Sequence, residues 1–168
     1  MDVTLRIAGI VKESIVDGPG IRLVIFAQGC KHKCPGCHNP ETHSFEGGNL
    51  ISVEEILEQV KKNPLLDGVT FSGGDPFEQG RAFSILGAKV KELGLNGMTY
   101  TGYTFEEILD GMKTKPEWSA LLYTTDILVD GRFDISKKSL MLKYKGSSNQ
   151  RVIDVKKSFE LNEIILVV

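Results

Sequence analysis

Apolar strands alternate with capped helices along this chain, and that alternation constrains its fold more than any other feature. Residues 22–28 (RLVIFAQ), 69–72 and 98–101 have the short apolar composition of buried strands. Helices are predicted to begin where an N-cap residue precedes a glutamate at the third helical position: Ser52 with Glu55, Asp75 with Glu78, and Thr104 with Glu107. Each helix follows a strand, which predicts βα units and a largely parallel sheet.

The remaining segments fit the same class less regularly. Residues 126–130 and 164–168 are predicted strands, residues 140–144 a less apolar strand, and residues 113–117 and 146–150 loops. A length of 168 residues suits a single domain, 1–168, and falls short of the roughly 250 residues usual for a closed eight-stranded barrel. The predicted fold class is therefore α/β, as an open, mostly parallel sheet or an incomplete (partial) TIM-like βα barrel.

All three cysteines, Cys30, Cys34 and Cys37, lie in one loop directly after the first predicted strand. Clusters of four irons and four sulfides are usually held by four cysteine thiolates. Three thiolates spaced C-x3-C-x2-C would leave one iron open to an outside ligand, because the sequence has no fourth cysteine. The spacing therefore predicts a 4Fe-4S cluster with a reactive corner.

A zinc site is the alternative for these cysteines, with His32, His38 or His43 completing a tetrahedral Cys3His set. Zinc ligands usually come as two separated pairs, whereas these thiols crowd into one loop, so the spacing favours the cluster. For His38, contact with a metal ligand or a place as an ordinary polar loop residue is favoured over ligation of the metal itself. The odd number of cysteines also argues against a disulfide.

Composition and charge exclude several other functions. The net charge is −2, so nothing indicates a surface for nucleic acid. The longest apolar runs, 23–27 and 164–168, have five residues each, which is too short for a membrane helix or a secretory signal. Three thiols without an export signal are typical of the reducing cytoplasm, so we expect a cytoplasmic protein with no membrane and no nucleic-acid partner.

The segment Ser72-Gly73-Gly74-Asp75 joins a predicted strand to a predicted helix. Its two glycines allow positive φ and close approach of backbone, and the helix start offers N–H groups to an anion. An ordinary βα turn capped by Asp75 and a site for the amino and carboxylate ends of an amino acid both fit this pattern. Sites in parallel sheets gather at the carboxyl ends of strands, so we expect this turn and the cysteine loop to share one rim.

Two charged or compact segments flank the first strand. Asp17-Gly18-Pro19-Gly20 predicts a tight turn with little side-chain bulk, against which another backbone could lie. Arg22 then has the place of a charge at the edge of a strand. Lys31-His32-Lys33 puts positive charge beside the thiols, which favours thiolates and a docked carboxylate, although a solvated loop has the same composition.

These motifs resemble the radical S-adenosylmethionine superfamily, in which C-x3-C-x2-C follows the first strand of the core. The segments 17–20, 30–39 and 72–75 are similar to the glycyl-radical-enzyme activases. Three further segments look like the branch that activates an anaerobic ribonucleoside-triphosphate reductase: Thr101-Gly102-Tyr103-Thr104, Val129-Asp130-Gly131-Arg132-Phe133 and Gly146-Ser147-Ser148-Asn149-Gln150-Arg151. Gly36 stands where many superfamily members have an aromatic residue, and Asp75 where many have glutamate; both look like this branch.

The resemblance implies a role for each motif residue. Cys30, Cys34 and Cys37 would ligate the 4Fe-4S cluster, and the amine and carboxylate of S-adenosylmethionine would chelate its open iron. Gly73, Gly74 and Asp75 would hold that amino-acid end, with Gly36, Cys37 and His38 beside the cofactor. The segment Asp17-Gly18-Pro19-Gly20 would face the partner, a glycine-bearing loop of the reductase.

The implied activity is that of an enzyme, an oxidoreductase that cleaves S-adenosylmethionine reductively. An electron donor such as flavodoxin or ferredoxin would reduce the cluster, and a 5′-deoxyadenosyl radical would take a hydrogen atom from a glycine of the class III reductase. The alternatives are another glycyl-radical-enzyme activase, such as one acting on pyruvate formate-lyase, a small-molecule radical enzyme, a small electron carrier, or a zinc-stabilised binding module. The last two need no Gly-Gly-Asp turn.

Overall fold

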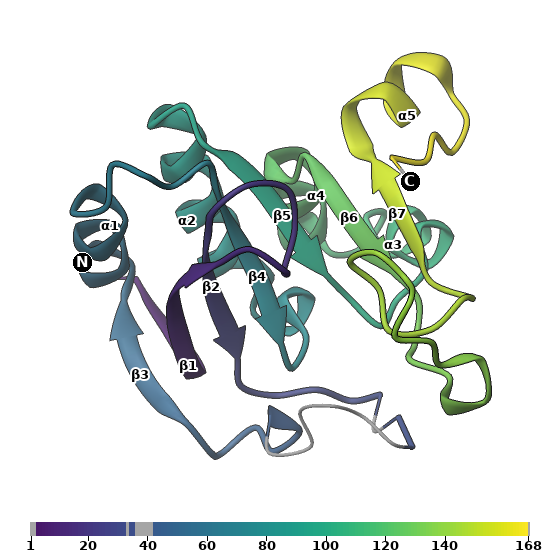
Figure 1. Ribbon diagram of the computed structural model, residues 1–168, viewed down its shortest axis with the longest axis horizontal. Helices are drawn as coiled ribbons and strands as arrows, with labels where there is room; N and C mark the ends of the chain where they lie inside the picture. Colours follow the sequence, from purple (N-terminus) through teal and green to yellow (C-terminus); the bar gives the residue numbers. More distant parts are fainter. Residues whose placement is uncertain (1–2, 33, 36–41, 168) are drawn as a thin grey trace.

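The described strands form one sheet whose centre is parallel and whose edges are antiparallel. The structure is a computed structural model that describes residues 3–32, 34–35 and 42–167. In this part of the chain seven strands pair in the order β3-β1-β2-β4-β5-β6-β7 (Figure 1). They are β1 Thr4–Ser14, β2 Arg22–Ala27, β3 Asn49–Ser52, β4 Gly68–Gly73, β5 Asn96–Tyr100, β6 Ile127–Asp130 and β7 Arg151–Asp154.

Strands β2, β4, β5 and β6 run parallel, whereas β1, β3 and β7 pair antiparallel with their neighbours. This arrangement confirms the predicted α/β class with a mostly parallel sheet. The three central strands predicted from apolar runs, and the strand predicted over 126–130, are present within one or two residues of the expected bounds. The antiparallel strands β1, β3 and β7 were not predicted.

The helices pack on one face of the sheet and bury the main core there (Figure 1). They are α1 Val53–Lys61, α2 Gly80–Glu92, α3 Phe105–Gly111, α4 Pro116–Thr124 and α5 Val155–Leu161, with short 3-10 turns η2 Pro76–Gln79 and η3 Ile135–Lys137. Phe83, Leu86 and Val90 of α2 belong to the same core as Ile25 and Phe71 of the sheet. Side chains alternate between the faces of a strand, so the other face is left for the site.

Local capping explains where the helices begin. Ser52 accepts a hydrogen bond from the N–H of Glu55 at the start of α1, as predicted. Thr104 and Glu107 form the complete reciprocal capping box at α3. Asp75 caps as predicted, but it caps the 3-10 turn η2, and α2 begins only at Gly80. A pattern based on nearby residues therefore located each start, but not the type of turn that follows it.

Several predicted segments are wrong. Residues 164–168 do not form a strand where they are described; Leu166 makes one isolated bridge to Ile153 of β7. Residues 140–144 are turns and bends, and Leu140 and Met141 are exposed. The predicted loop over 113–117 overlaps α4, which begins at Pro116. Proline is common at the first position of a helix, and Pro116 is the residue of this sequence that marks the start of α4.

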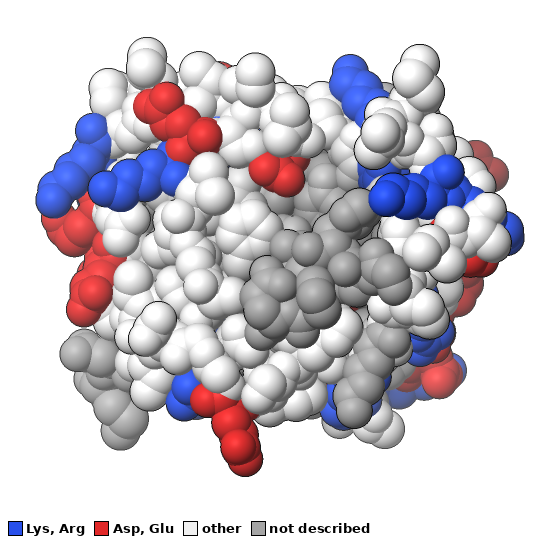
Figure 2. Space-filling model, turned by 60° about the horizontal axis from the view of Figure 1, so that its bottom comes forward, with Lys and Arg blue, Asp and Glu red and all other residues white. Residues whose placement is uncertain are grey.

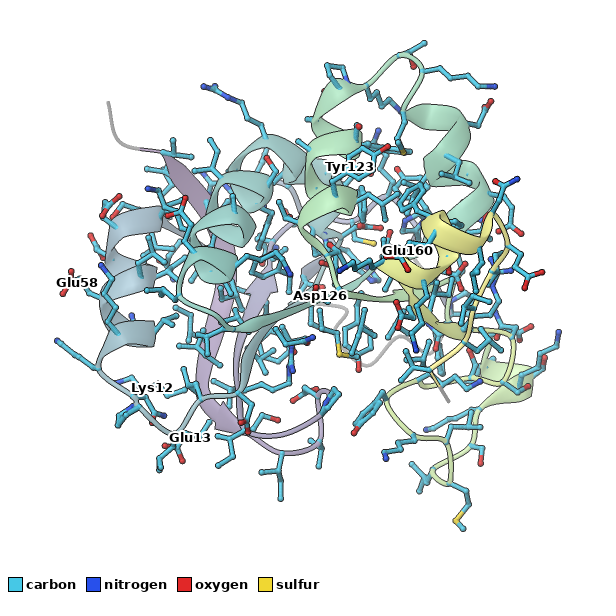
Figure 3. All side chains as sticks on the ribbon, turned by 90° about the horizontal axis from the view of Figure 1, so that it is seen from above. Lys12, Glu13, Glu58, Tyr123, Asp126 and Glu160 are labelled. Atoms are coloured by element: carbon cyan, nitrogen blue, oxygen red, sulfur yellow. The ribbon has the colours of Figure 1, made fainter. Side chains whose placement is uncertain are left out.

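Asp126 shows how the loops at the amino ends of the strands are tied together. Figure 3 views the molecule from above and shows this residue between the helices and the sheet. Its carboxylate accepts from the N–H of Gly97 at 2.8 Å and from Lys91 Nζ at 2.5 Å. The strands β5 and β6 and helix α2 are thereby joined at one end, opposite the end that carries the cavity.

Among the described residues, no helix has the length and apolar character needed to cross a membrane.

Candidate functional site

A cavity of about 450 Å³ lies at the carboxyl ends of the parallel strands, on the face without helices. Its wall includes Cys30 and Cys34 from the cysteine loop and Gly73 and Gly74 from the turn after β4. Figure 2 looks towards this end of the molecule, and the described surface seen there is mostly uncharged. The prediction that the cysteine loop and the glycine turn share one rim is confirmed.

The cysteine loop is closed at its neck by backbone hydrogen bonds. The N–H of Gly29 donates to the carbonyl of Thr42 at 2.6 Å, and the N–H of Cys30 donates to the carbonyl of His43 at 3.2 Å. Gln28 adds a side-chain bond to the carbonyl of Ser44. The loop therefore leaves β2 and returns beside it, which holds its first cysteine at the sheet.

The two described cysteines differ in exposure. Cys30 is buried, with 8% of its surface accessible, and Cys34 is half-buried. Both thiols are free of disulfides and line the cavity. Cys37, Gly36 and His38 lie outside the described residues, so their predicted roles stay predictions. Two thiols in one cavity wall, with a third cysteine three residues beyond Cys34, suit the predicted cluster.

The glycines of the turn after β4 are required by the chain's own packing. Gly73 has φ +86°, and a Cβ there would lie 2.5 Å from the backbone nitrogen of Ala27. A Cβ on Gly74 would lie 2.5 Å from the carbonyl oxygen of Gly29. The N–H groups of Gly74 and Asp75 donate to the carbonyls of Ala27 and Gly29, so they are already used within the chain. The turn is thus fastened to the end of β2, just before Cys30.

Asp75 is buried and does not line the cavity. Its carboxylate is fully inaccessible and accepts hydrogen bonds from Phe77 N–H, Thr101 Oγ1 and Gly102 N–H at 2.9–3.0 Å. Its Oδ2 lies 2.7 Å from Nε2 of His32. This carboxylate holds protein groups from three segments, and its predicted contact with the cofactor stays a prediction. Only the tertiary structure brings those segments together.

His32 connects Asp75 to a second loop. Its side chain is only 4% exposed, and its Nδ1 lies 3.1 Å from Nε of Arg132. The ring packs edge-on against Tyr103, with 4.5 Å between ring centroids. Among the three predicted positive residues, Lys31 is solvated and pairs with Glu78 at 3.4 Å, whereas Lys33 lies outside the described residues. His32 is therefore a buried connecting residue, and Lys31 fits the solvated alternative.

The segment 131–134, which overlaps the motif 129–133, is hydrogen-bonded to the motif 146–151. Gln150 donates to the carbonyl of Gly131 at 2.9 Å, and Asn149 donates to the carbonyl of Arg132 at 2.8 Å. The buried Ser147 accepts from the N–H of Asp134 at 3.1 Å. Residues 146–150 are a loop, as predicted, and their side chains fix the backbone on both sides of Arg132.

The turn Asp17-Gly18-Pro19-Gly20 crosses the open face of the sheet (Figure 1) and is anchored by buried side chains. Arg22 Nη1 donates to the carbonyl of Pro19 at 2.9 Å, and Thr70 Oγ1 donates to the carbonyl of Asp17 at 2.8 Å. Gly18 and Gly20 have positive φ, as expected for this turn. Asp17 lines the cavity. Arg22 is only 1% exposed, so its prediction as an edge charge is wrong.

Four aromatic residues also line the cavity: Phe26, Tyr100, Phe133 and Tyr144. Of these, only Phe133 belongs to a motif that the sequence singled out. Tyr100 donates from its hydroxyl to the carbonyl of Tyr144 at 2.5 Å, and burial raises the pKa of Tyr100 well above its ordinary value. Tyr144 has a positive φ of 65°, which is unusual for a bulky residue and occurs most often at functional sites. Strand alternation places Phe26 and Tyr100 on one face, but no local signal marks Tyr144.

Comparison with known proteins gives consistent matches along most of the chain. Residues 16–153 match the family described as a 4Fe-4S single cluster domain. The anaerobic ribonucleoside-triphosphate reductase-activating protein of Vibrio cholerae is 33% identical over 144 residues, which cover 81% of this chain and 89% of the relative. The protein of the same name from Enterobacteria phage T4 is 32% identical over 146 residues, covering 82% and 86%.

The chain belongs to the family of anaerobic ribonucleoside-triphosphate reductase-activating proteins.

A related activase matches a shorter part of the chain. The pyruvate formate-lyase-activating enzyme of Clostridium pasteurianum is 41% identical over 113 residues, which cover 62% of this chain and 48% of that enzyme. The resemblance to glycyl-radical-enzyme activases is thus confirmed, as are an enzymatic role and the iron–sulfur character of the family. The zinc-stabilised module is the weaker alternative, because the matching family is defined by a 4Fe-4S cluster.

Proposed function

We propose that this protein activates an anaerobic, class III ribonucleotide reductase by forming a glycyl radical on it. The observation that carries the proposal is the shared cavity of Cys30, Cys34, Gly73 and Gly74, in a chain of the reductase-activating family. The cysteine loop and the glycine turn thus line the same cavity. An electron carrier would need the thiols, but it would not need the turn.

We propose that Cys30, Cys34 and Cys37 ligate the 4Fe-4S cluster. When bound, the cluster would supply the electron for reductive cleavage of S-adenosylmethionine, the chemistry by which hydrogen would be taken from the glycine of the reductase. The protein orders the thiols, excludes water and places the reacting groups. The neck bonds of Gly29 and Cys30 hold the loop at the sheet, so the position of Cys30 is set before any cofactor binds.

Gly73 and Gly74 are proposed to hold the amino-acid end of S-adenosylmethionine. The N–H groups of Gly74 and Asp75 are engaged by the chain itself, so the turn would act through carbonyl oxygens, which accept from an ammonium group. Gly36, Cys37 and His38 are proposed to lie beside the cofactor. Asp75 contributes by holding the surrounding segments, since its carboxylate is buried among protein donors.

The reductase is proposed to present its glycine-bearing loop to the open face of the sheet, next to Asp17-Gly18-Pro19-Gly20. Asp17 lines the cavity, and the turn is fixed by Arg22 and Thr70, so it offers a firm backbone surface.

We infer that the sheet is the partial βα barrel expected from the resemblance, in one domain over 1–168. We also propose a cytoplasmic protein reduced by flavodoxin or ferredoxin, without nucleic-acid or membrane partners.

The proposal is tested by anaerobic reconstitution with iron and sulfide, reduction, and measurement of 5′-deoxyadenosine. Addition of an anaerobic ribonucleotide reductase should then give a glycyl-radical EPR signal that depends on S-adenosylmethionine. Cys30→Ala, Cys34→Ala and Cys37→Ala should each abolish cofactor cleavage, because each removes a cluster ligand. Ser44→Ala, an exposed change just outside the loop, should retain it. Cleavage that survives in any cysteine variant would contradict the ligand assignment.

A second candidate function is activation of a different glycyl-radical enzyme. The 41% identity to the Clostridium pasteurianum enzyme over 113 residues supports this candidate. The two functions are separated by offering the reconstituted protein an anaerobic ribonucleotide reductase and a pyruvate formate-lyase side by side. A glycyl-radical signal on the reductase alone supports the first proposal, and a signal on the lyase alone supports the second.

A further inference from the structure

We propose that His32 is a positioning residue that locks the segment between Cys30 and Cys34 to the Gly73–Gly74 turn. In this arrangement Asp75 and Arg132 fix the imidazole ring from its two sides, so the thiol loop and the glycine turn keep one relative position. The inference rests on the proposed function, since it concerns how the two halves of that site are aligned. It assigns a role to His32 and to the two loop motifs that the reaction itself does not explain.

The hydrogen-bond partners define the orientation of the ring. Arg132 Nε can only donate, so Nδ1 of His32 must accept this bond of 3.1 Å. The proton of the neutral ring is then on Nε2, which donates to Oδ2 of Asp75 over 2.7 Å. A ring bound through both nitrogens cannot rotate without losing a bond. The segment that carries it is thereby fixed in direction as well as in position.

Steric contacts restrict the same ring. Tyr103 packs against it edge-on, and a Cβ on Gly102 would lie 2.3 Å from its Cδ2 atom. Gly102 therefore leaves the space that the imidazole occupies. Tyr103 is held in turn by a hydrogen bond from its hydroxyl to Glu78, which also pairs with Lys31. The ring thus sits in a pocket built by residues that follow β4 and β5.

Asp75 transmits the position of His32 to the glycine turn. The carboxylate is held by Phe77, Thr101 and Gly102, while its own backbone N–H donates to Gly29 at 2.8 Å. One residue therefore contacts the start of the cysteine loop through its backbone and the middle of that loop through its side chain. Movement of the loop between Cys30 and Cys34 would break these bonds.

Arg132 is placed by the loop motifs on the far side of the ring. Asn149 and Gln150 bond the carbonyls of Arg132 and Gly131, so the backbone that carries the guanidinium is fixed. The side chain of Arg132 is 52% exposed and makes a longer contact of 3.8 Å with Glu107. The loop over 146–150 thus holds the backbone of Arg132, and through Arg132 it helps to position His32.

Three variants separate the two bonds of the ring. His32→Ala removes both. His32→Gln brings an amide nitrogen to the region of Nε2 and can keep the bond to Asp75, whereas His32→Asn reaches only the region of Nδ1. Lys31→Gln is the matched control in the same loop, because the Lys31 side chain is 66% exposed and its ion pair with Glu78 is neither of the two bonds of the ring.

The first measurement uses the cluster-free protein. Hydrogen exchange of peptides covering residues 28–35 should be faster by about tenfold in His32→Ala, since the segment loses a buried hydrogen-bond partner. His32→Gln should lie closer to wild type than His32→Asn does. Exchange in the helices α1 and α2 should stay unchanged. If residues 28–35 of the His32→Ala variant exchange at the wild-type rate, the proposal is overturned.

The second measurement uses reconstituted protein and follows iron release to a chelator, together with the EPR spectrum of the reduced cluster before and after S-adenosylmethionine. His32→Ala should lose iron about 10-fold faster or more, as for other partners that orient metal ligands, and should show a weaker cofactor-induced spectral change. His32→Gln should restore both and His32→Asn should not. Equal behaviour of Gln and Asn, or acceleration of exchange throughout the chain, would reduce His32 to a general stability role and overturn the proposal.

Failure of this inference can be told from failure of the proposed function. If wild-type protein takes up no 4Fe-4S cluster, the proposed function fails, while hydrogen exchange of the cluster-free variants still tests the His32 contact. If wild type binds the cluster and responds to S-adenosylmethionine, and His32→Ala responds equally, only the positioning role fails.

Discussion

Arg22 shows how much one side chain can organise on the face of the sheet that carries the cavity. Its guanidinium donates to Thr70 Oγ1 at 2.7 Å, to the carbonyls of Pro19 and Val69, and to the carbonyl and side chain of Asn96. Burial lowers the pKa of Arg22 from its ordinary value, which is the expected cost of removing a charge from water. The dense set of acceptors offsets that cost and ties the turn 17–20 to three strands.

We expect Arg22→Met to lower the free energy of unfolding by about 3 kcal/mol or more, because it leaves buried acceptors such as Asn96 and Thr70 without their donor. Urea denaturation measures this. Arg81→Met, on the exposed side of α2, is the matched control and should change stability by no more than about 0.5 kcal/mol. A loss below about 1 kcal/mol for Arg22→Met would show that the buried network contributes little.

At the scale of elements, Asp130 joins α3, β6 and β7 at the edge of the sheet. This buried carboxylate at the end of β6 accepts from the N–H of Phe105, which begins α3, at 2.8 Å. It also accepts from Arg151, the first residue of β7, whose guanidinium bonds Glu106 of α3 at 2.5 Å. The antiparallel edge strand is therefore fastened to the parallel sheet by charge as well as by backbone pairing.

This connection predicts a dependence of stability on pH. The hydrogen bond from Arg151 lowers the pKa of Glu106, so the folded state binds a proton at this site less readily than the unfolded state does. The stabilisation is therefore present above the ordinary glutamate pKa and is lost as pH falls through the lowered value, between about pH 5 and pH 3. Because the Glu106 side chain is 61% exposed, we expect its ion pair with Arg151 to contribute no more than about 1 kcal/mol to the free energy of unfolding.

Chemical denaturation at several pH values would measure this term. Glu106→Gln should reduce the loss of stability below pH 5, and high salt should reduce it in wild type too. Glu54→Gln, an exposed glutamate in the first turn of α1, is the matched control. Equal pH profiles for wild type and Glu106→Gln would show that the pair with Arg151 does not stabilise the fold.

At the scale of the whole molecule, the core and the site lie on opposite faces of one sheet. The main buried cluster packs between the sheet and the helices, and none of the described residues that line the cavity belongs to it. Helix burial therefore stabilises the fold independently of what the cavity holds. This separation also leaves one face of the sheet for a partner and a cofactor.

We accordingly expect the protein to stay folded when its cluster is removed. After treatment with an iron chelator and a reductant, the far-UV circular dichroism spectrum should be unchanged and thermal unfolding should remain cooperative, because the main core lies between the sheet and the helices and includes neither Cys30 nor Cys34. A domain held together by its metal would instead unfold on chelation. Loss of the helical signal would contradict the separation of core and site.

Features that depend on neighbouring residues can be predicted from the amino-acid sequence. Cysteine spacing indicated the cluster, and the cap residues Ser52 and Thr104 marked helix starts, because each pattern acts within a few positions. Asp75 shows where that logic ends. Its cap was predicted, but its bonds to His32, Thr101 and Gly102 join residues up to 43 positions apart.

Which polar groups meet inside the molecule depends on long-range packing. In the folded protein Arg22 is buried, and His32 is hydrogen-bonded to Asp75. Asn149 holds the backbone of Arg132, and Glu78 accepts from the hydroxyl of Tyr103 instead of capping a helix. Buried polar groups must find partners wherever the chain brings them, and those partners depend on the packing of distant strands and loops. Local patterns therefore located the thiol loop and the glycine turn, while long-range hydrogen bonding set their alignment.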